Sequence, residues 1–192
     1  MQTGYGGLAK AGMWGSCYAH EAYKVYKERK SKSKPCGQIV KYVRTKTQQL
    51  IDGYSDLEIR WASQQDSRDR KDFLSELHSN QSYCYSLHGI LEYYDKNYDK
   101  AFEYFKISSS KNTAGMTDRI YNLGCTASLL FQKTRAAHYL AIVIECYIAL
   151  SDHISEARNF VADLDVKPIK AEIDNELRKL GKQNLITPDV MR

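Results

Sequence analysis

Apolar residues recur every three or four positions along most of the chain, and this spacing constrains the fold more than any other feature. One clear stripe consists of Ile120, Leu123, Ala127 and Leu130, and another of Ile169, Ile173, Leu177 and Leu180. A helix turns once in 3.6 residues, so side chains spaced in this way share one helix face and need an apolar surface opposite them. No two segments alternate in the manner of paired strands. The sequence therefore predicts an all-α fold of antiparallel helical hairpins.

Glycine and polar residues predict where these helices begin and end. Gly53 is expected to end one helix, and the capping box over residues 55–58 to start the next. Two further helices are expected over residues 68–78 and 85–95. Asp165 is expected to cap the last helix of the chain.

The length of 192 residues suits a single domain. Apolar residues make up 43% of the chain and charged residues 27%, which is ordinary globular usage and excludes disorder as the main state. The most apolar stretch, residues 136–150, contains His138 and Glu145 and is shorter than the roughly 20 residues that cross a bilayer. We therefore expect no transmembrane span, and we divide the chain into a flexible glycine-rich leader over 1–17, one helical domain over 18–181 and a tail over 182–192.

Positive charge is concentrated near the N-terminus. Residues 24–46 contain Glu28 as their one acidic residue and nine basic residues, whereas residues 47–192 contain 18 basic and 21 acidic ones. The basic residues are Lys24, Lys27, Arg29, Lys30, Lys32, Lys34, Lys41, Arg44 and Lys46. Such a segment favours a polyanionic partner, either nucleic acid or an anionic membrane surface. The alternative is a solvated lysine-rich helix end and loop with no partner.

The five cysteines form no C-x-x-C pair, which disfavours a zinc ribbon or a thioredoxin-type site. Cys17 and Cys36 flank the basic segment and are the one pair for which we consider a disulfide, while Cys125 and Cys146 are expected to be buried free thiols. The leader fits a processed lipoprotein as well as a natural start. The compartment stays open, with the cell envelope favoured over the cytoplasm.

The second half of the chain contains an internal repeat with an offset of 35 residues. Gly89 pairs with Gly124 and Ala101 with Ala136, and a bulky residue follows each alanine by four positions. A glycine without a Cβ and a small alanine let two helices of a hairpin approach closely, and the large residues fill the space beside them.

This pattern resembles the tetratricopeptide repeat over residues 82–150. The matching positions are Tyr85, Gly89, Tyr98, Ala101 and Phe105 in the first copy and Leu123, Gly124, Ala136 and Leu140 in the second. His88 and Glu92 depart from the family's usual Leu and Tyr. The resemblance implies an array of about two repeats with flanking or capping helices. A plain array of α-hairpins is the alternative.

In the tetratricopeptide family, the first helices of successive hairpins line a concave groove that holds a peptide. By position, the resemblance implies that the groove is lined by Tyr83, Ser86, Ile90, Tyr93, Tyr94, Asp118, Tyr121, Cys125, Ser128 and Leu129. This lining is aromatic, nearly neutral and without lysine or arginine, which predicts an apolar or mixed ligand segment. Alternatively, the flanking helices fill the groove.

Motifs of catalysis are not recognisable in the sequence. It contains no glycine-rich phosphate loop, no H-E-x-x-H and no G-x-S-x-G. Cys84, His88 and Glu92 follow one another at four-residue steps, but one helix face rarely closes a metal shell by itself. We therefore expect no enzyme, no metal and no cofactor.

The expected function is that of a non-enzymatic scaffold or adaptor. It would bind another protein, as a peptide or helix segment, through the repeat groove and within a larger assembly. The runner-up is a helical protein that binds nucleic acid or an anionic membrane through residues 24–46.

Overall fold

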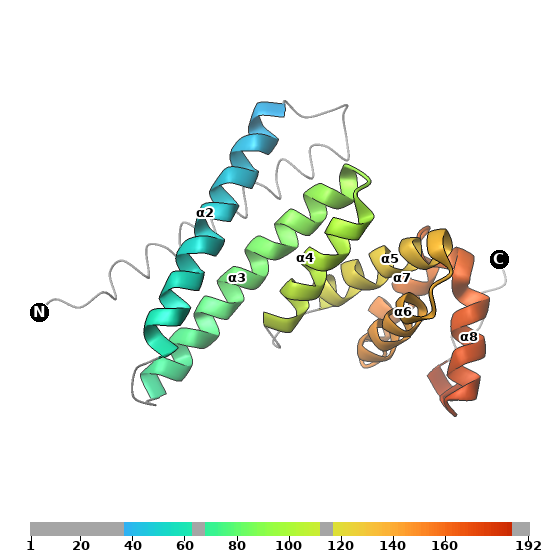
Figure 1. The fold of residues 1–192 in the computed structure, drawn as a ribbon. Coiled ribbons are helices and arrows are strands. Elements are labelled where there is room, and N and C mark those ends of the chain that lie inside the picture. The colour runs from blue at the N-terminus through green and yellow to red at the C-terminus, as the bar shows by residue number, and fades with distance from the viewer. Residues whose placement is uncertain (1–36, 63–67, 112–116, 186–192) are drawn as a thin grey trace, which may run out of the picture.

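The computed structural model describes residues 37–62, 68–111 and 117–185 (Figure 1). Within these ranges the regular structure is entirely helical, so the predicted all-α fold is confirmed. The leader, the Cys17–Cys36 pair considered for a disulfide and the first six cations of the basic segment lie outside the described residues, as does most of the C-terminal tail.

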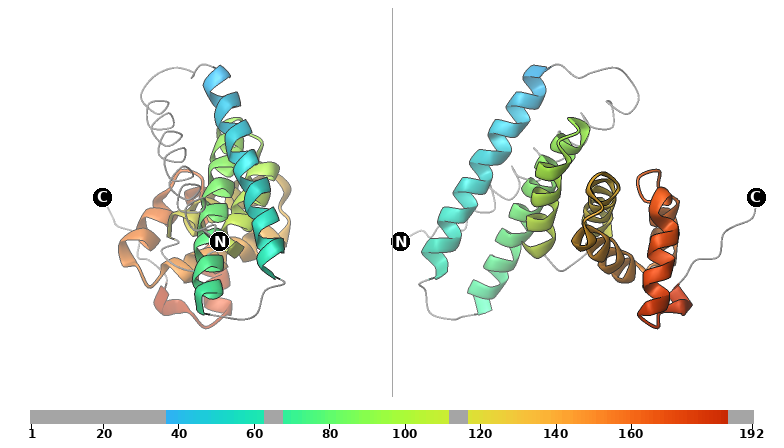
Figure 2. Two further views of the ribbon diagram at one scale, coloured as in Figure 1. Left: turned by 90° about the vertical axis from the view of Figure 1, so that its left-hand side faces the viewer. Right: turned by 45° about the vertical axis from the view of Figure 1, so that its right-hand side comes forward.

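The bounds of the helices are α2 Gly37–Ala62, α3 Arg68–Tyr94, α4 Tyr98–Lys111, α5 Thr117–Thr134, α6 Ala137–Leu150, α7 Ile154–Ala162 and α8 Lys170–Lys179, with short 3-10 turns at Lys167–Ile169 (η1) and Gln183–Leu185 (η2). From α2 to α7 consecutive helices pack against one another, and α8 packs against α6. Helices α2 to α4 lie at one end and α5 to α8 at the other (Figures 1 and 2). The α4–α5 contact joins the two ends. No helix in the described part of the chain has the length and apolar character needed to cross a membrane.

Two helices are longer than the sequence predicts. Helix α2 continues through Gly53 to Ala62, and Ser55 donates its hydroxyl to the Ile51 carbonyl 2.9 Å away instead of capping a new helix. Gly53 is solvent-exposed and costs a helix only about 1 kcal/mol. Burial of Ile51 and Tyr54 against α3 opposes that cost. Helix α3 likewise runs unbroken from Arg68 to Tyr94, although the sequence predicts two separate helices over residues 68–78 and 85–95.

The main apolar core lies among α5 to α8. Its fully buried side chains include Leu130, Leu150, Phe160, Ile173 and Leu177. Smaller clusters join α2 to α3 through Val43 and Leu87 and through Ile51, Tyr54, Leu77 and Cys84. The C-terminal half is therefore the part of the described chain with the largest continuous core.

The two repeat glycines both lie where helices approach closely. A Cβ on Gly89 would be 2.7 Å from ring carbons of Phe105, and one on Gly124 would be 2.5 Å from the Phe160 ring. The first contact is the α3–α4 contact that the repeat predicts. The second contact is with α7, a helix outside the predicted repeat.

The two hairpins differ in how far the repeat glycine lies from the end of its helix. Helix α3 ends at Tyr94, five residues after Gly89, whereas α5 ends at Thr134, ten residues after Gly124. As a result Ala101 is fully buried inside α4, but Ala136 precedes the first residue of α6 and is half-buried. The second copy thus keeps the glycine of the pattern without reproducing the position of its alanine. Membership of the tetratricopeptide family stays a prediction.

Polar side chains form a seam between α2 and α3. Arg44 binds the carboxylates of Glu92 and Asp95, the latter at 2.6 Å. Thr47 donates to the Val43 carbonyl at 2.8 Å, so Nε2 of His88, 2.8 Å from the Thr47 hydroxyl, is the donor in that pair. His88 and Glu92 therefore each contact a side chain of α2 and help to hold α2 against α3.

Acidification from about pH 7 to about pH 5 is expected to weaken this seam. Burial lowers the pKa of His88 below its usual 6.5; Arg44 acts in the same direction and Glu92 opposes it. The fold therefore favours the neutral ring, while the unfolded chain takes up a proton near pH 6.5. The stabilisation is fully present above that pH and is lost as the pH falls toward the folded pKa.

Urea unfolding at the two pH values measures this effect. The loss of stability on acidification should be smaller for His88→Gln than for the wild type. The exposed His138 gives a matched control, and His138→Gln should lose as much stability as the wild type. An equal loss in all three proteins would contradict a role for His88.

Candidate functional site

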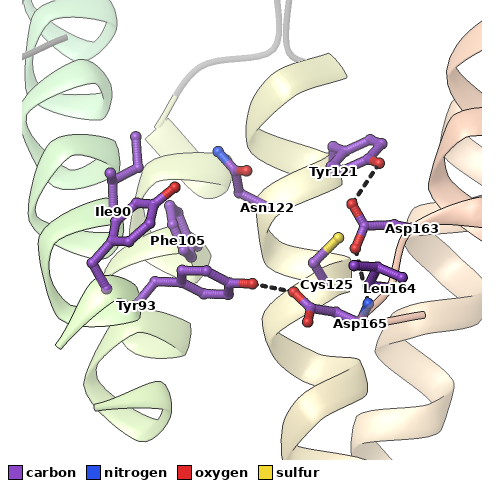
Figure 3. A pocket seen from close by; sticks show the side chains of 10 residues that line it. Ile90, Tyr93, Phe105, Tyr121, Asn122, Cys125, Asp163, Leu164 and Asp165 are labelled. Atoms are coloured by element: carbon purple, nitrogen blue, oxygen red, sulfur yellow. Dashed lines mark hydrogen bonds between the residues drawn. The ribbon is translucent and has the colours of Figure 1, made fainter. Parts of the chain in front are cut away.

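A hollow lies between α3 and α5 and is bounded on its far side by α7 and the turn after it. It consists of two adjoining depressions of about 460 Å³ and 650 Å³, which share Ile90, Tyr121 and Asn122. The smaller one (Figure 3) is further lined by Tyr93, Tyr94, Phe105, Cys125, Asp163, Leu164 and Asp165. The larger one is further lined by Tyr83, Ser86, Leu87, Asp118, Arg119, Glu156 and Asn159. We call the two depressions together the hollow.

The structure places eight of the ten sequence-predicted groove residues in this lining. They come from α3 (Tyr83, Ser86, Ile90, Tyr93 and Tyr94) and from α5 (Asp118, Tyr121 and Cys125). Ser128 is not part of it, because its side chain is buried and donates to the Asp165 carbonyl at 2.6 Å. Leu129 is half-buried and does not line either depression.

The lining from α7 and its following turn is absent from the sequence prediction. Residues 156–165 form one side of the hollow, and Phe160 anchors them by packing on Gly124. The flanking helix therefore narrows the groove without filling it. No local signal in the sequence places α7 here, because its position depends on tertiary packing against α5 and α6. Arg119 also escapes the prediction, although it directly follows Asp118.

Two tyrosine–aspartate pairs connect the walls of the smaller depression (Figure 3). Tyr93 of α3 donates its hydroxyl to the Asp165 carboxylate. Tyr121 of α5 donates to Asp163 at 2.9 Å and to the Asn159 carbonyl at 3.1 Å. The Asp165 backbone N–H donates to Asp163 Oδ1 at 2.9 Å. These bonds fix the turn after α7 against both α3 and α5.

The surroundings of these groups disfavour ionisation. Burial raises the pKa of Tyr93 and of Tyr121, and the hydrogen bond that each donates to an aspartate raises it further. Burial also raises the pKa of Asp165, with the negative charge of Asp163 adding to it and the Tyr93 hydrogen bond opposing it. Burial, Asp163 and Asp165 together raise the pKa of the Cys125 thiol. The tyrosines and the thiol are thus neutral at physiological pH.

The hollow is acidic rather than nearly neutral. Its charged lining residues are Asp118, Glu156, Asp163 and Asp165, opposed by Arg119. Burial lowers the pKa of Arg119, and its buried Nη1 has no hydrogen-bond partner in the described structure. The difference from the sequence prediction arises because three of the four acids belong to α7 and its turn. The lining of the hollow therefore carries an excess of negative charge.

Of the nine basic residues in the predicted patch, the structure describes Lys41, Arg44 and Lys46. Arg44 is engaged by Glu92 and Asp95. Lys46 donates to Gln49 Oε1 at 3.1 Å, and Lys41 is exposed. These three cations lie on α2 and do not line the hollow.

No family model, curated protein or solved structure matches this chain.

Proposed function

We propose that this protein is a non-enzymatic helical scaffold of tetratricopeptide-like design that binds a cationic segment of another protein in the hollow. The observation that carries the proposal is the coincidence of four tyrosines, Tyr83, Tyr93, Tyr94 and Tyr121, with four carboxylates on one concave surface. The four carboxylates outnumber the one arginine of the same lining.

The tyrosines account for the affinity that such a surface needs. Tyrosine gives a large apolar contact area at low conformational cost and presents its ring face to cations. Tyr83 and Tyr94 are the most exposed of the four. A lysine or arginine side chain lying on such a ring gains about 0.5–1 kcal/mol at an exposed site. Ile90 adds an apolar surface between them.

The charges account for the selectivity of the hollow. Asp118 and Glu156 lie in the larger depression, so a cationic side chain placed between α5 and α7 meets negative charge from both helices. Nucleic acid is a poorer ligand here, because its phosphates would be repelled by the acidic lining.

The lining also supports a non-catalytic role. None of its residues is a histidine, so Ser86 has no imidazole base within the lining. The Cys125 thiol is kept protonated by burial and by two neighbouring aspartates. An activated nucleophile requires the opposite shift.

Selection from a random-peptide display library tests the proposal on the full chain. Peptides that bind the wild-type protein should be enriched in Lys and Arg, with apolar residues between them. The double variant Asp118→Asn with Glu156→Gln should lose this enrichment, because it removes two carboxylates from the larger depression. Binding of the enriched peptides should also weaken with added salt.

The control is Glu103→Gln, which removes one exposed carboxylate from α4 outside the lining. It should select the same peptides as the wild type. Selection of neutral or acidic peptides by the wild type would contradict the proposal, as would an unchanged selection by the double variant.

A further inference from the structure

Three metal-ligand atoms converge at the end of the hollow next to the turn after α7. They are Sγ of Cys125 and one carboxylate oxygen each of Asp163 and Asp165, and all three lie within 4.8 Å of one another. We propose that these residues bind one Zn²⁺ ion. The inference goes beyond the peptide-binding function and does not depend on it.

The carboxylates of this site lack a cationic partner. In the described structure neither Asp163 nor Asp165 forms a salt bridge, and their hydrogen bonds come from neutral groups. Burial raises the pKa of both the Asp165 carboxyl and the Cys125 thiol, and the nearby negative charge of Asp163 adds to the shift in each case. A divalent cation would supply the positive charge that this cluster needs.

The Cys125 thiol is the second and independent observation. The residue is only 5% exposed, forms no disulfide, and its thiol has no hydrogen-bond partner in the described structure. Its sulfur points toward Asp163 (Figure 3), lies within 4.8 Å of a carboxylate oxygen of each aspartate, and belongs to a residue that lines the smaller depression. Two carboxylates alone would suit any hard cation, whereas a thiolate favours Zn²⁺ over Mg²⁺ and Ca²⁺.

Tyr93 and Tyr121 add the outer shell that metal sites require. Each donates its hydroxyl to one of the two carboxylates and so orients it from a different helix. Hydrogen bonds of this kind set the direction of ligand atoms, and their loss commonly costs 10- to 100-fold in metal affinity. The aspartates are therefore positioned before any ion arrives.

The coordination would leave one position open. Three protein ligands and one open position describe an open tetrahedral zinc site. Because all three ligand residues line the smaller depression, a fourth ligand would come from that depression. Zinc–ligand distances of about 2.0–2.3 Å bring ligand atoms within about 3.5 Å of one another. Binding thus requires a modest closing of the cluster. It also releases the thiol proton to solvent, so affinity should fall as the pH is lowered.

Cobalt and zinc titrations test the site on the full chain. The protein would be treated with a chelator and would contain Cys17→Ser and Cys36→Ser, which remove the thiols outside the described residues. We expect one Co²⁺ per chain with a thiolate-to-cobalt charge-transfer absorption, displaced by one equivalent of Zn²⁺. Mg²⁺ and Ca²⁺ should not displace it.

Variants distinguish this site from binding elsewhere. Cys125→Ser should abolish the charge-transfer absorption and weaken Zn²⁺ at least tenfold. Asp165→Asn should weaken Zn²⁺ while keeping an oxygen that accepts from Tyr93. Cys146→Ser is the matched control, because Cys146 is also a buried free thiol but lies outside the cluster. If Cys125→Ser does not fold, Asp165→Asn decides the question by itself.

Three results would overturn the zinc site. They are the absence of Co²⁺ and Zn²⁺ binding by the wild type, a charge-transfer absorption that survives Cys125→Ser, and equal losses in the Cys125 and Cys146 variants. Binding of a lysine-rich peptide by the metal-free protein, weakened by Asp165→Asn in the absence of any zinc affinity, would assign the cluster to a cationic side chain instead. Peptide selection uses metal-free protein, so the two proposals can fail separately.

Discussion

Replacement of Phe160 by alanine is expected to lower the free energy of unfolding by about 3–5 kcal/mol. The ring is completely buried and joins three helices. It covers Gly124 of α5, packs edge-on against Tyr121 with ring centroids 5.4 Å apart, and stacks on Tyr147 of α6 at 6.4 Å. Its removal leaves a cavity where α5, α6 and α7 meet, in the part of the described chain with the largest core.

Urea unfolding monitored by circular dichroism measures the loss. Leu164→Ala is the matched control, because Leu164 follows the same helix but is 85% exposed. That variant should stay within about 0.5 kcal/mol of the wild type. A loss below about 1 kcal/mol for Phe160→Ala would contradict the position of α7 against α5, and with it the far wall of the hollow.

A single methyl group at Gly124 is expected to cost about 1–3 kcal/mol, the cost of an overpacked core. The new Cβ would lie 2.5 Å and 2.6 Å from two ring carbons of Phe160 and 3.0 Å from the Cβ of Cys146. The contact with Cys146 involves an atom fixed to the α6 backbone, so rotation of the Phe160 ring alone does not relieve it. Helices α5 and α6 must move apart.

Gly53→Ala is the matched control for this prediction. Gly53 is also a helical glycine, but no atom lies within 4 Å of an added Cβ. Alanine there should therefore stabilise the protein by about 0.5–1 kcal/mol through helix propensity. Gly124→Ala combined with Phe160→Leu should recover part of the loss. Equal free energies of unfolding for Gly124→Ala and Gly53→Ala would contradict the close packing of Phe160 and Cys146 on Gly124.

The fold was predictable as far as local pattern determines it. Spacing of apolar residues identified the helices, and the close approach of α3 and α4 at Gly89 followed from the repeat. The helix boundaries at Gly53 and at the middle of α3 were wrong, because buried contacts of Tyr54 and Ser82 with neighbouring helices outweigh the local preference for a break. Such contacts are set by tertiary packing and leave no local signal.

The candidate site was likewise predictable from the sequence only in part. The α3 and α5 sides followed from the resemblance to the tetratricopeptide repeat, which implied that Tyr83, Ile90 and Tyr121 line a groove. The acidic side of the hollow, formed by Glu156, Asp163 and Asp165, did not follow from the sequence. Asp165 has the sequence context of a helix cap, yet α8 begins only at Lys170 and the Asp165 carboxylate accepts from Tyr93, 72 positions away in sequence. Only the docking of α7 brings these residues together.

Site-specific photo-crosslinking tests the central claim, that the hollow is the binding surface. A photoreactive phenylalanine would replace Tyr94, which lines the hollow and is 40% exposed, or Ile59, which lies on α2 outside the lining and is 71% exposed. With a lysine-rich peptide from the display selection, we predict strong crosslinking from position 94 and none from position 59. Crosslinking from position 59 alone, or equal yields from both, would contradict the account.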